Sequence, residues 1–403
     1  MELMHVVIFS HSYPPFTFGG IGSFTSDLAM ELSNQGVQVT VISGRPRINA
    51  VPNGFKLGEV KAVDNANLKV IRLGFLNVPP RHLIFQLSNL KKIRKIIKDV
   101  KPDVIHGQSG STFPSIRYFK DLAPVVVTFH LNPKTQQLLS LYSMTRGGSF
   151  GDFFTFFLGY PLWNISLRKE FEESDAAVFP SKTSMEELTS YWRGGVNDDF
   201  LDKCVTIYNG VNLERLDEFS SGCREEEEPT LVFGGRLYWS KGVLYLLRLA
   251  KILKEKSEYK WKISIFGSGP MLTKLKRTAL KYDLTNVRLH GKVDRRVFIQ
   301  SLSKSDFLVF PSFNELCPMV LLEAMCLGVI PLLLNTAFAY ELTENGKFGV
   351  ISSSVEEMAE KLDAMYSDGS FRSLKKELKT YAREKFDIKK VASNYVRLYD
   401  QLI

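Results

Sequence analysis

The stretch FPSFNELCPMVLLEAMCLGVIPLLL, residues 310–334, decides the fold class. We expect a buried strand end, a loop that carries Glu315, a short apolar helix that carries Glu323, and a second strand. Gly328 stands where a helix ends in the left-handed conformation. Uninterrupted apolar runs are typical of parallel strands that are covered on both faces. The stretch therefore predicts two carboxylates near the carboxyl edge of a parallel sheet, where open α/β folds bind their ligands.

The same alternation of strand and helix patterns runs along the whole chain. Strands are predicted at residues 5–10, 37–43, 69–74, 104–108, 125–130, 176–180, 205–209, 231–234, 262–267, 287–291, 307–311, 329–334 and 349–352. Helical patterns lie between most of them, and two more, at 371–386 and 388–402, close the chain. This rhythm predicts βαβ units on parallel sheets. Residues 212–229, with their Ser-Ser-Gly and four consecutive glutamates, interrupt the rhythm and predict a solvated linker or edge.

Length and composition favour a two-domain protein in a reducing compartment. A chain of 403 residues is long enough for two domains of roughly 200 residues, each with its own core. Its four cysteines are scattered, without C-x-x-C spacing, which argues against a disulfide framework or a zinc site. We see no signal peptide, and the apolar cluster at 153–163 is too short to span a bilayer. We therefore expect a soluble, cytoplasmic protein.

Part of the net charge of +9 is concentrated in one predicted helix. Residues 81–134 carry an excess of seven positive charges, and the basic side chains alternate with apolar ones over 83–98. Such a helix can lie on an anionic membrane, or it can be a surface helix whose apolar face is core. Both interpretations stay open. Peripheral contact with the inner membrane face is thus one expectation for this helix.

Two features of the first half suggest ligand contacts. The turn after the first strand contains Gly19, Gly20 and Gly22, which let backbone N–H groups approach an anion at a helix N-terminus. The spacing is not G-x-G-x-x-G, so the turn does not predict NAD binding. His130 closes the apolar run VVVTFH, where it faces a binding crevice or is a satisfied core histidine.

In the second half, VFGGRLYWSKG places Arg236 and Lys241 just after a strand. Two cations around a strand–helix turn can clamp a diphosphate without a metal ion. The chain contains no D-x-D motif, which argues against a magnesium held by carboxylates. The turns IFGSGP, with Gly267, and LHGKV follow two further strands and are equally consistent with packing or with binding.

In this order the motifs resemble those of the retaining nucleotide-sugar glycosyltransferases of family 4. The resemblance covers nearly the whole chain, through YPPFTFGGIGSF, the strand end at His130, YNGVN, GGRLYWSKG, FGSGP, LHGKV and NELCPMVLLEAMCLGVIP. Glu315 and Glu323, with seven residues between them, are its best marker. It implies the GT-B fold, an α/β architecture of two Rossmann-like doubly wound domains that face each other across a cleft. The domains would be 1–212 on the acceptor side and 213–385 on the nucleotide-sugar side, with 386–403 as a helix that returns to the first domain.

The resemblance also implies roles for individual residues. Glu323 would hold the donor ribose, and Glu315 would contact the sugar near its anomeric carbon as the glycosidic bond breaks. Arg236 and Lys241 would neutralise the departing diphosphate. His130 would touch a distal sugar hydroxyl. The other implied donor contacts are Gly19, Gly20, Gly267, Lys292, Val293, Cys317, Pro318, Met319 and Val320, of which Lys292 and Val293 lie near the nucleobase. No metal and no cofactor are expected, because the nucleotide-sugar is itself the donor substrate.

One departure from the family pattern lies beside Glu315. The family usually shows a small residue, an aromatic residue and a glycine there, whereas this chain has Leu316, Cys317 and Pro318. Pro318 has no N–H group, so we expect a missing backbone donor to the sugar hydroxyls and an unusual donor sugar or tilt.

The predicted activity is retaining transfer of a hexosyl-type sugar from a GDP- or UDP-linked donor to a sugar- or lipid-linked acceptor, in glycan or glycolipid biosynthesis. We favour a front-side departure in which the leaving phosphate takes the acceptor proton, over a covalent intermediate on Glu315. The alternative is a non-catalytic nucleotide-sugar-binding protein with a degenerate cleft. Binding of nucleic acid through the basic helix rests on charge alone and is not expected. Acceptor contacts are expected in 49–63 and 132–159.

Overall fold

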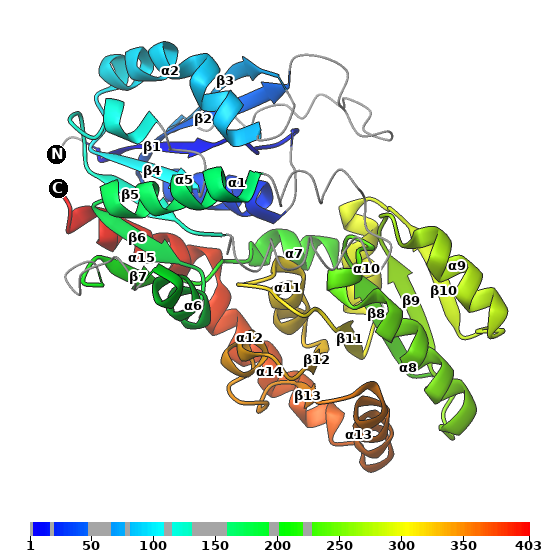
Figure 1. Ribbon diagram of the computed structural model, residues 1–403. Helices are drawn as coiled ribbons and strands as arrows, with labels where there is room; N and C mark the ends of the chain where they lie inside the picture. Colours follow the sequence, from blue (N-terminus) through cyan, green and yellow to red (C-terminus); the bar gives the residue numbers. More distant parts are fainter. Residues whose placement is uncertain are drawn as a thin grey trace. The chain divides into compact units, whose positions relative to one another are not determined.

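The computed structural model describes residues 3–16, 20–46, 66–76, 81–108, 115–130, 159–192, 201–220 and 228–403. These residues form two compact units. Unit 1 holds the described residues up to Gly210 together with Ile388–Ile403, and unit 2 holds Val211–Asp387. Each unit is built around one parallel sheet flanked by helices (Figure 1). The predicted acceptor loops, 49–63 and 132–159, lie almost entirely outside the described residues.

The sheet of unit 1 has the strand order β3-β2-β1-β4-β5-β6-β7. Its strands are β1 (His5–Ser10), β2 (Gln38–Pro46), β3 (Leu68–Phe75), β4 (Val104–Gln108), β5 (Val125–Thr128), β6 (Ala176–Phe179) and β7 (Cys204–Thr206). Its helices are α1 (Gly20–Asn34), α2 (Arg81–Val100), the 3-10 turn η1 (Ser115–Tyr118), α5 (Gly159–Glu173), α6 (Lys182–Trp192) and α15 (Ile388–Asp400). The C-terminal helix thus belongs to the first unit, as predicted.

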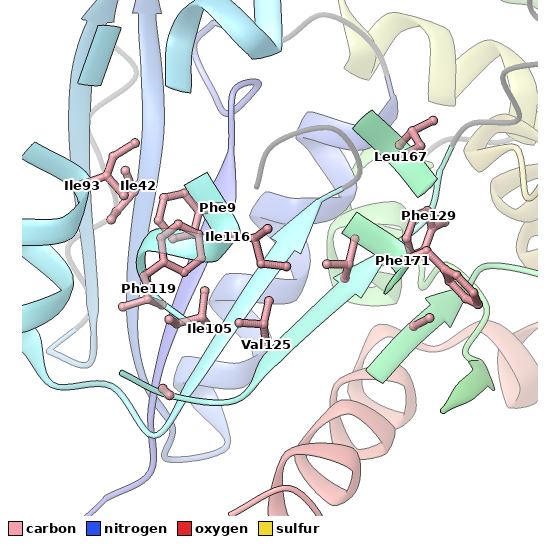
Figure 2. Packing of buried hydrophobic residues seen from close by; sticks show 14 of the residues in the cluster. Phe9, Ile42, Ile93, Ile105, Ile116, Phe119, Val125, Phe129, Leu167 and Phe171 are labelled. Atoms are coloured by element: carbon pink, nitrogen blue, oxygen red, sulfur yellow. The ribbon is translucent and has the colours of Figure 1, made fainter. Parts of the chain in front are cut away.

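Successive side chains of these strands point to opposite faces, and both faces are covered. On one face, residues such as Phe9, Ile105 and Val127 join a fully buried cluster with side chains of α2, η1, α5 and α6 (Figure 2). On the other face lie α1, which packs against α15, and α15 itself, whose tyrosines reach β4 and β5. The apolar face of α2 is therefore core, because Phe85 and Ile93 are completely buried.

The sheet of unit 2 has the strand order β10-β9-β8-β11-β12-β13. Its strands are β8 (Thr230–Gly234), β9 (Lys262–Phe266), β10 (Val287–Gly291), β11 (Phe307–Phe310), β12 (Ile330–Leu334) and β13 (Val350–Ser352). Its helices are α7 (Leu213–Phe219), the 3-10 turn η5 (Trp239–Lys241), α8 (Val243–Lys256), α9 (Leu272–Lys281), α10 (Arg295–Ser303), α11 (Met319–Leu327), α12 (Ala337–Leu342), α13 (Val355–Asp368) and α14 (Phe371–Phe386). Gly328 (φ 77°) ends α11 in the left-handed conformation, as predicted.

Both sheets confirm the predicted doubly wound α/β architecture. In each, the strand order reverses between the first and fourth strands of the unit, which are β1 and β4 in unit 1 and β8 and β11 in unit 2. Loops that leave such a pair of strands diverge to opposite faces and open a crevice at the carboxyl edge. Arg236 and Lys241 follow β8, and Glu315 follows β11. The fold therefore places the predicted charged residues of unit 2 at its topological switch point.

The prediction of a solvated linker at 212–229 is wrong for its first part, because residues 213–219 form α7. The side chain of Asn212 caps this helix by accepting a hydrogen bond of 2.9 Å from the backbone N–H of Arg215. Arg383 of α14 donates two hydrogen bonds, of 2.8 and 2.6 Å, to the carboxylate of Asp217. The acidic run dominates the sequence pattern here, whereas the helix depends on the Asn212 cap and on the ion pair of Asp217. Residues 221–227, with most of that run, lie outside the described part.

Candidate active site

Glu315 and Lys241 form an ion pair at the switch point of unit 2. The hydroxyl of Ser312 also donates to the Oε1 atom of Glu315, over 2.8 Å. The Glu315 side chain is 14% exposed and that of Lys241 is 31% exposed, so the pair is sheltered but reachable. The structure thus brings together two of the predicted catalytic residues, which lie 74 positions apart in the chain.

A close backbone contact between the loops after β8 and β11 holds this pair in place. Gly242 follows Lys241 with φ 66°, and a Cβ atom there would lie 2.0 Å from the carbonyl oxygen of Pro311. The N–H of Phe313 donates to the carbonyl oxygen of Ser240 over 3.1 Å. Only glycine allows both the positive φ and this approach. The glycine after Lys241 is therefore needed to bring that lysine to Glu315.

The second carboxylate, Glu323, lies in α11 and is only 1% exposed. It is paired with Arg295, the first residue of α10. Asp294 caps α10, because its side chain accepts a hydrogen bond of 2.8 Å from the backbone N–H of Arg296. Arg295 was not among the residues predicted from the sequence. The only feature of the sequence that could have indicated Arg295 is its position directly after Asp294, a helix-capping aspartate that follows β10.

Five more of the predicted residues of unit 2 lie in loops at the carboxyl edge of the same sheet. Arg236 is exposed, and its side chain makes no hydrogen bond or ion pair with the described residues. Gly267 (φ 136°) passes so close to the loop after β8 that a Cβ atom would lie 1.8 Å from the carbonyl oxygen of Gly235. Lys292 is exposed and Val293 half-buried, both just after β10, while Cys317 is buried beside Glu315.

The structure also limits the consequence expected of Pro318. This residue is the N-cap of α11, with φ −75° and ψ 121°. Its carbonyl oxygen accepts the N–H groups of Leu321 and Leu322, at 3.0 and 3.2 Å. The first-turn N–H groups of Met319 and Val320 have no acceptor within the helix. The proline therefore removes a donor before the helix and leaves these two in place.

In unit 1, the structure describes Gly20 and His130, whereas Gly19 lies outside the described residues. Gly20 is exposed and is the first residue of α1. His130 follows β5 and is partly buried. Its ring makes a T-shaped contact with Phe24, and its Nε2 atom lies 2.6 Å from the Oε1 atom of Gln108. Burial lowers the pKa of His130 to about 4, so the ring is neutral near pH 7.

Comparison with known protein families identifies the class of protein. Residues 18–215 match the model of Glycosyltransferase Family 4, and residues 215–385 match that of Glycosyl transferases group 1. The chain belongs to these glycosyltransferases. It is 24% identical to an uncharacterized glycosyltransferase of Methanocaldococcus jannaschii, with 98% of both chains covered. It is also 25% identical to the N,N'-diacetylbacillosaminyl-diphospho-undecaprenol alpha-1,3-N-acetylgalactosaminyltransferase of Campylobacter jejuni, over 52% of this chain and 53% of that one.

Solved structures agree on the fold. The sucrose-phosphate synthase of Thermosynechococcus elongatus superposes with a TM-score of 0.75 at 16% identity, over 100% of this glycosyltransferase and 99% of that chain. Anabaena HepE in complex with UDP-glucose gives a TM-score of 0.66 at 15% identity, over 99% and 100% of the two chains. These similarities establish the GT-B fold.

The described part of this glycosyltransferase has no group of three or more histidine, cysteine or acidic side chains placed to hold a metal ion. Nor do its described helices include one that is both long and apolar enough to cross a membrane.

Proposed function

We propose that this glycosyltransferase transfers a hexosyl-type sugar, with retention of anomeric configuration, from a UDP- or GDP-linked donor to a sugar- or lipid-linked acceptor. The observation that carries the proposal is the contact of Lys241 with Glu315 at the switch point of unit 2, with the exposed Arg236 in the same loop after β8. A diphosphate at this edge would meet two cations without a metal ion, and a sugar attached to it would lie near a carboxylate.

The comparisons support the choice of substrates. The crystal structure of Anabaena HepE is a complex with UDP-glucose. The name of the Campylobacter relative describes an acceptor that is linked to undecaprenol through a diphosphate. We propose a donor and an acceptor of the same classes here. We also propose that the donor ribose hydroxyls bind Glu323, in exchange for part of its contact with Arg295.

In the proposed reaction, the bond between the anomeric carbon and the donor phosphate oxygen breaks while an acceptor oxygen bonds to the same face of that carbon. The acceptor proton passes to the leaving phosphate. Lys241 and Arg236 stabilise the negative charge that grows on the diphosphate. Glu315 stabilises the positive charge that grows on the sugar ring, and His130 holds a distal sugar hydroxyl.

The first test is a thermal-shift panel of UDP- and GDP-sugars on the purified protein, because a ligand that binds only the native state raises the melting temperature. The second is transfer by Glu315→Gln, with Glu360→Gln, an exposed glutamate of α13, as the matched control. We expect Glu315→Gln to keep the donor-induced shift and to lose transfer by roughly a hundredfold or more, whereas the control keeps both.

Two outcomes would contradict the proposal. Undiminished transfer by Glu315→Gln would remove this carboxylate from the reaction. Donor binding without release of nucleoside diphosphate, over a panel of sugar and polyprenyl-diphosphate acceptors, would favour the non-catalytic alternative.

A further inference from the structure

A chain of buried polar side chains runs through unit 1 from the C-terminal helix to His130. Ile105 and Val127 point into the apolar cluster, so the next residue of each strand, His106 of β4 and Thr128 of β5, points to the opposite face, where α15 lies. His106, Thr128 and Tyr399 have no exposed surface. Buried polar groups need partners, and these side chains find them in one another.

His106 is the centre of this chain. Its Nδ1 atom lies 2.7 Å from the hydroxyl of Tyr399, and its Nε2 atom lies 2.7 Å from the hydroxyl of Thr128. The Thr128 hydroxyl lies 3.0 Å from that of Tyr395. Burial lowers the pKa of His106 to about 3, so at neutral pH the ring has a single N–H group. One ring nitrogen therefore donates and the other accepts.

The amide of Gln108, at the end of β4, indicates which ring nitrogen of His106 donates and which accepts. Its Oε1 atom lies 2.6 Å from the Nε2 atom of His130, and its Nε2 atom lies 3.3 Å from the Nε2 atom of His106. The amide oxygen accepts, so His130 donates from Nε2. The amide nitrogen donates, so His106 accepts at Nε2 and donates from Nδ1 to Tyr399. All three hydrogen bonds then run in one direction, from His130 to α15.

We propose that Gln108 is a positioning residue that holds His130 in its Nε2–H tautomer, and that Tyr399 fixes this orientation from the C-terminal helix. A neutral imidazole with its proton on Nε2 carries a lone pair on Nδ1. In this tautomer the Nδ1 atom of His130 can only accept, so a sugar hydroxyl that reached Nδ1 would have to donate to it. This last step rests on the proposed function, whereas the tautomer is inferred from the orientation of the Gln108 amide between the two imidazole rings.

The tautomer is tested by 15N NMR of the histidine side chains in the full chain, with the His130 signals assigned through His130→Asn. In the wild type we expect a pyrrole-like shift at Nε2 and a pyridine-like shift at Nδ1 of His130. Gln108→Met keeps the length of the side chain but removes the acceptor, so both tautomers become populated. Gln108→Glu restores an acceptor beside Nε2 and therefore keeps the proton there.

Tyr399→Phe is the stricter test, because the described contacts connect Tyr399 to His130 through His106 and Gln108. Without that hydroxyl, a buried N–H at Nδ1 of His106 lacks its acceptor, and an unpaired buried donor is costlier than an unpaired acceptor. We expect the His106 proton to move to Nε2, the Gln108 amide to turn over, and the proton of His130 to move to Nδ1. Asn89→Leu is the control, since it removes buried hydrogen bonds of the same unit that do not touch the chain.

A His130 spectrum that is unchanged in both Gln108→Met and Tyr399→Phe, or a wild-type proton on Nδ1, would overturn the proposal. A spectrum that changes as much in Asn89→Leu would show a general loss of packing and would overturn it too. If the protein transfers sugar, Gln108→Met should lower kcat/KM by roughly five- to tenfold, the value of one hydrogen bond, without weakening the binding of free nucleoside diphosphate. The NMR result stands without any transfer, so failure of the proposed function is distinguishable from failure of this inference.

Discussion

The buried imidazole of His106 makes the stability of unit 1 depend on pH in a defined window. Its pKa is about 3 in the folded protein because of burial, against about 6.5 in an unfolded chain. Between these values the unfolded chain binds a proton that the folded protein does not. Stability therefore falls as the pH is lowered below about 6.5 and is constant above it, since neither state is then protonated. From about pH 7 to about pH 5, this histidine alone should lower the free energy of unfolding by about 2 kcal/mol.

The perturbation that isolates this effect is His106→Gln, which keeps a buried amide at the site but does not titrate. We expect the variant to be less stable at pH 7 by about 1–3 kcal/mol, because the amide cannot reproduce both hydrogen bonds of 2.7 Å. Its stability should change less on acidification than that of the wild type. The difference between the two proteins should therefore shrink by about 2 kcal/mol between pH 7 and pH 5.

Hydrogen exchange of peptides from β4 and β5, corrected for the intrinsic pH dependence of amide exchange, reports this free energy for unit 1 alone. Ionisable groups that have no contact with this chain of side chains contribute equally to both proteins and cancel in the difference. His290→Gln, in unit 2, is the control and should leave exchange in β4 and β5 unchanged. A difference that is independent of pH would refute the reasoning, because it would mean that His106 binds its proton equally in the folded and unfolded states.

Two further predictions test the close contact of Gly267 with Gly235 in unit 2 and the exposed lysines of α2. Gly267→Ala should destabilise unit 2 by more than Gly291→Ala, because Gly291 also has a positive φ but has open space at its Cβ position. Gly291→Ala should cost about 1 kcal/mol of stability. Equal losses of thermal stability in the two variants would contradict the close contact of Gly267 with Gly235. Replacing three exposed lysines of α2 by glutamine should weaken co-sedimentation with anionic vesicles by about 1 kcal/mol per charge, and more than the same change on α9, whereas equal effects would indicate charge alone. The two triplets are Lys91, Lys95 and Lys98 on α2, and Lys274, Lys276 and Lys281 on α9.

Apolar patterning predicted the fold well because it records burial on both faces of a sheet. The predicted bounds of β1, β4, β10 and α14 agree with the structure, since apolar runs and turn residues coincide at their ends. The helix α7 was missed because one capping side chain and one ion pair hold it against its acidic composition. The order of the strands could not be predicted from periodicity. Periodicity shows how a segment is buried, but it does not show which strand lies next to it in the sheet.

Some residues of the candidate site could likewise be predicted from the sequence, and others could not. Residues that follow strands, such as Lys241 and Glu315, were predictable because the carboxyl ends of parallel strands meet at one edge. Arg295 was not, because its partner Glu323 is defined only by the packing of α10 beside α11. The contact of His106 with Tyr399 joins residues 293 positions apart, and no local pattern marks either as polar core.

The ion pairs of Glu315 and Glu323, both in unit 2, bear on how a donor could bind. Lys241 is paired with Glu315 and Arg295 with Glu323, while Arg236 has no ion pair among the described residues. Under the proposed function, a diphosphate would attract Lys241 away from Glu315, and ribose hydroxyls would take over part of Glu323. Glu315 would thus be released toward the sugar only when the diphosphate is in place, because the same lysine cannot fully neutralise both anions. The spacing of the two glutamates in the sequence would then have a physical reason. Each carboxylate would give up its contact with a cation of unit 2 and contact a different part of the same donor, Glu315 the sugar and Glu323 the ribose.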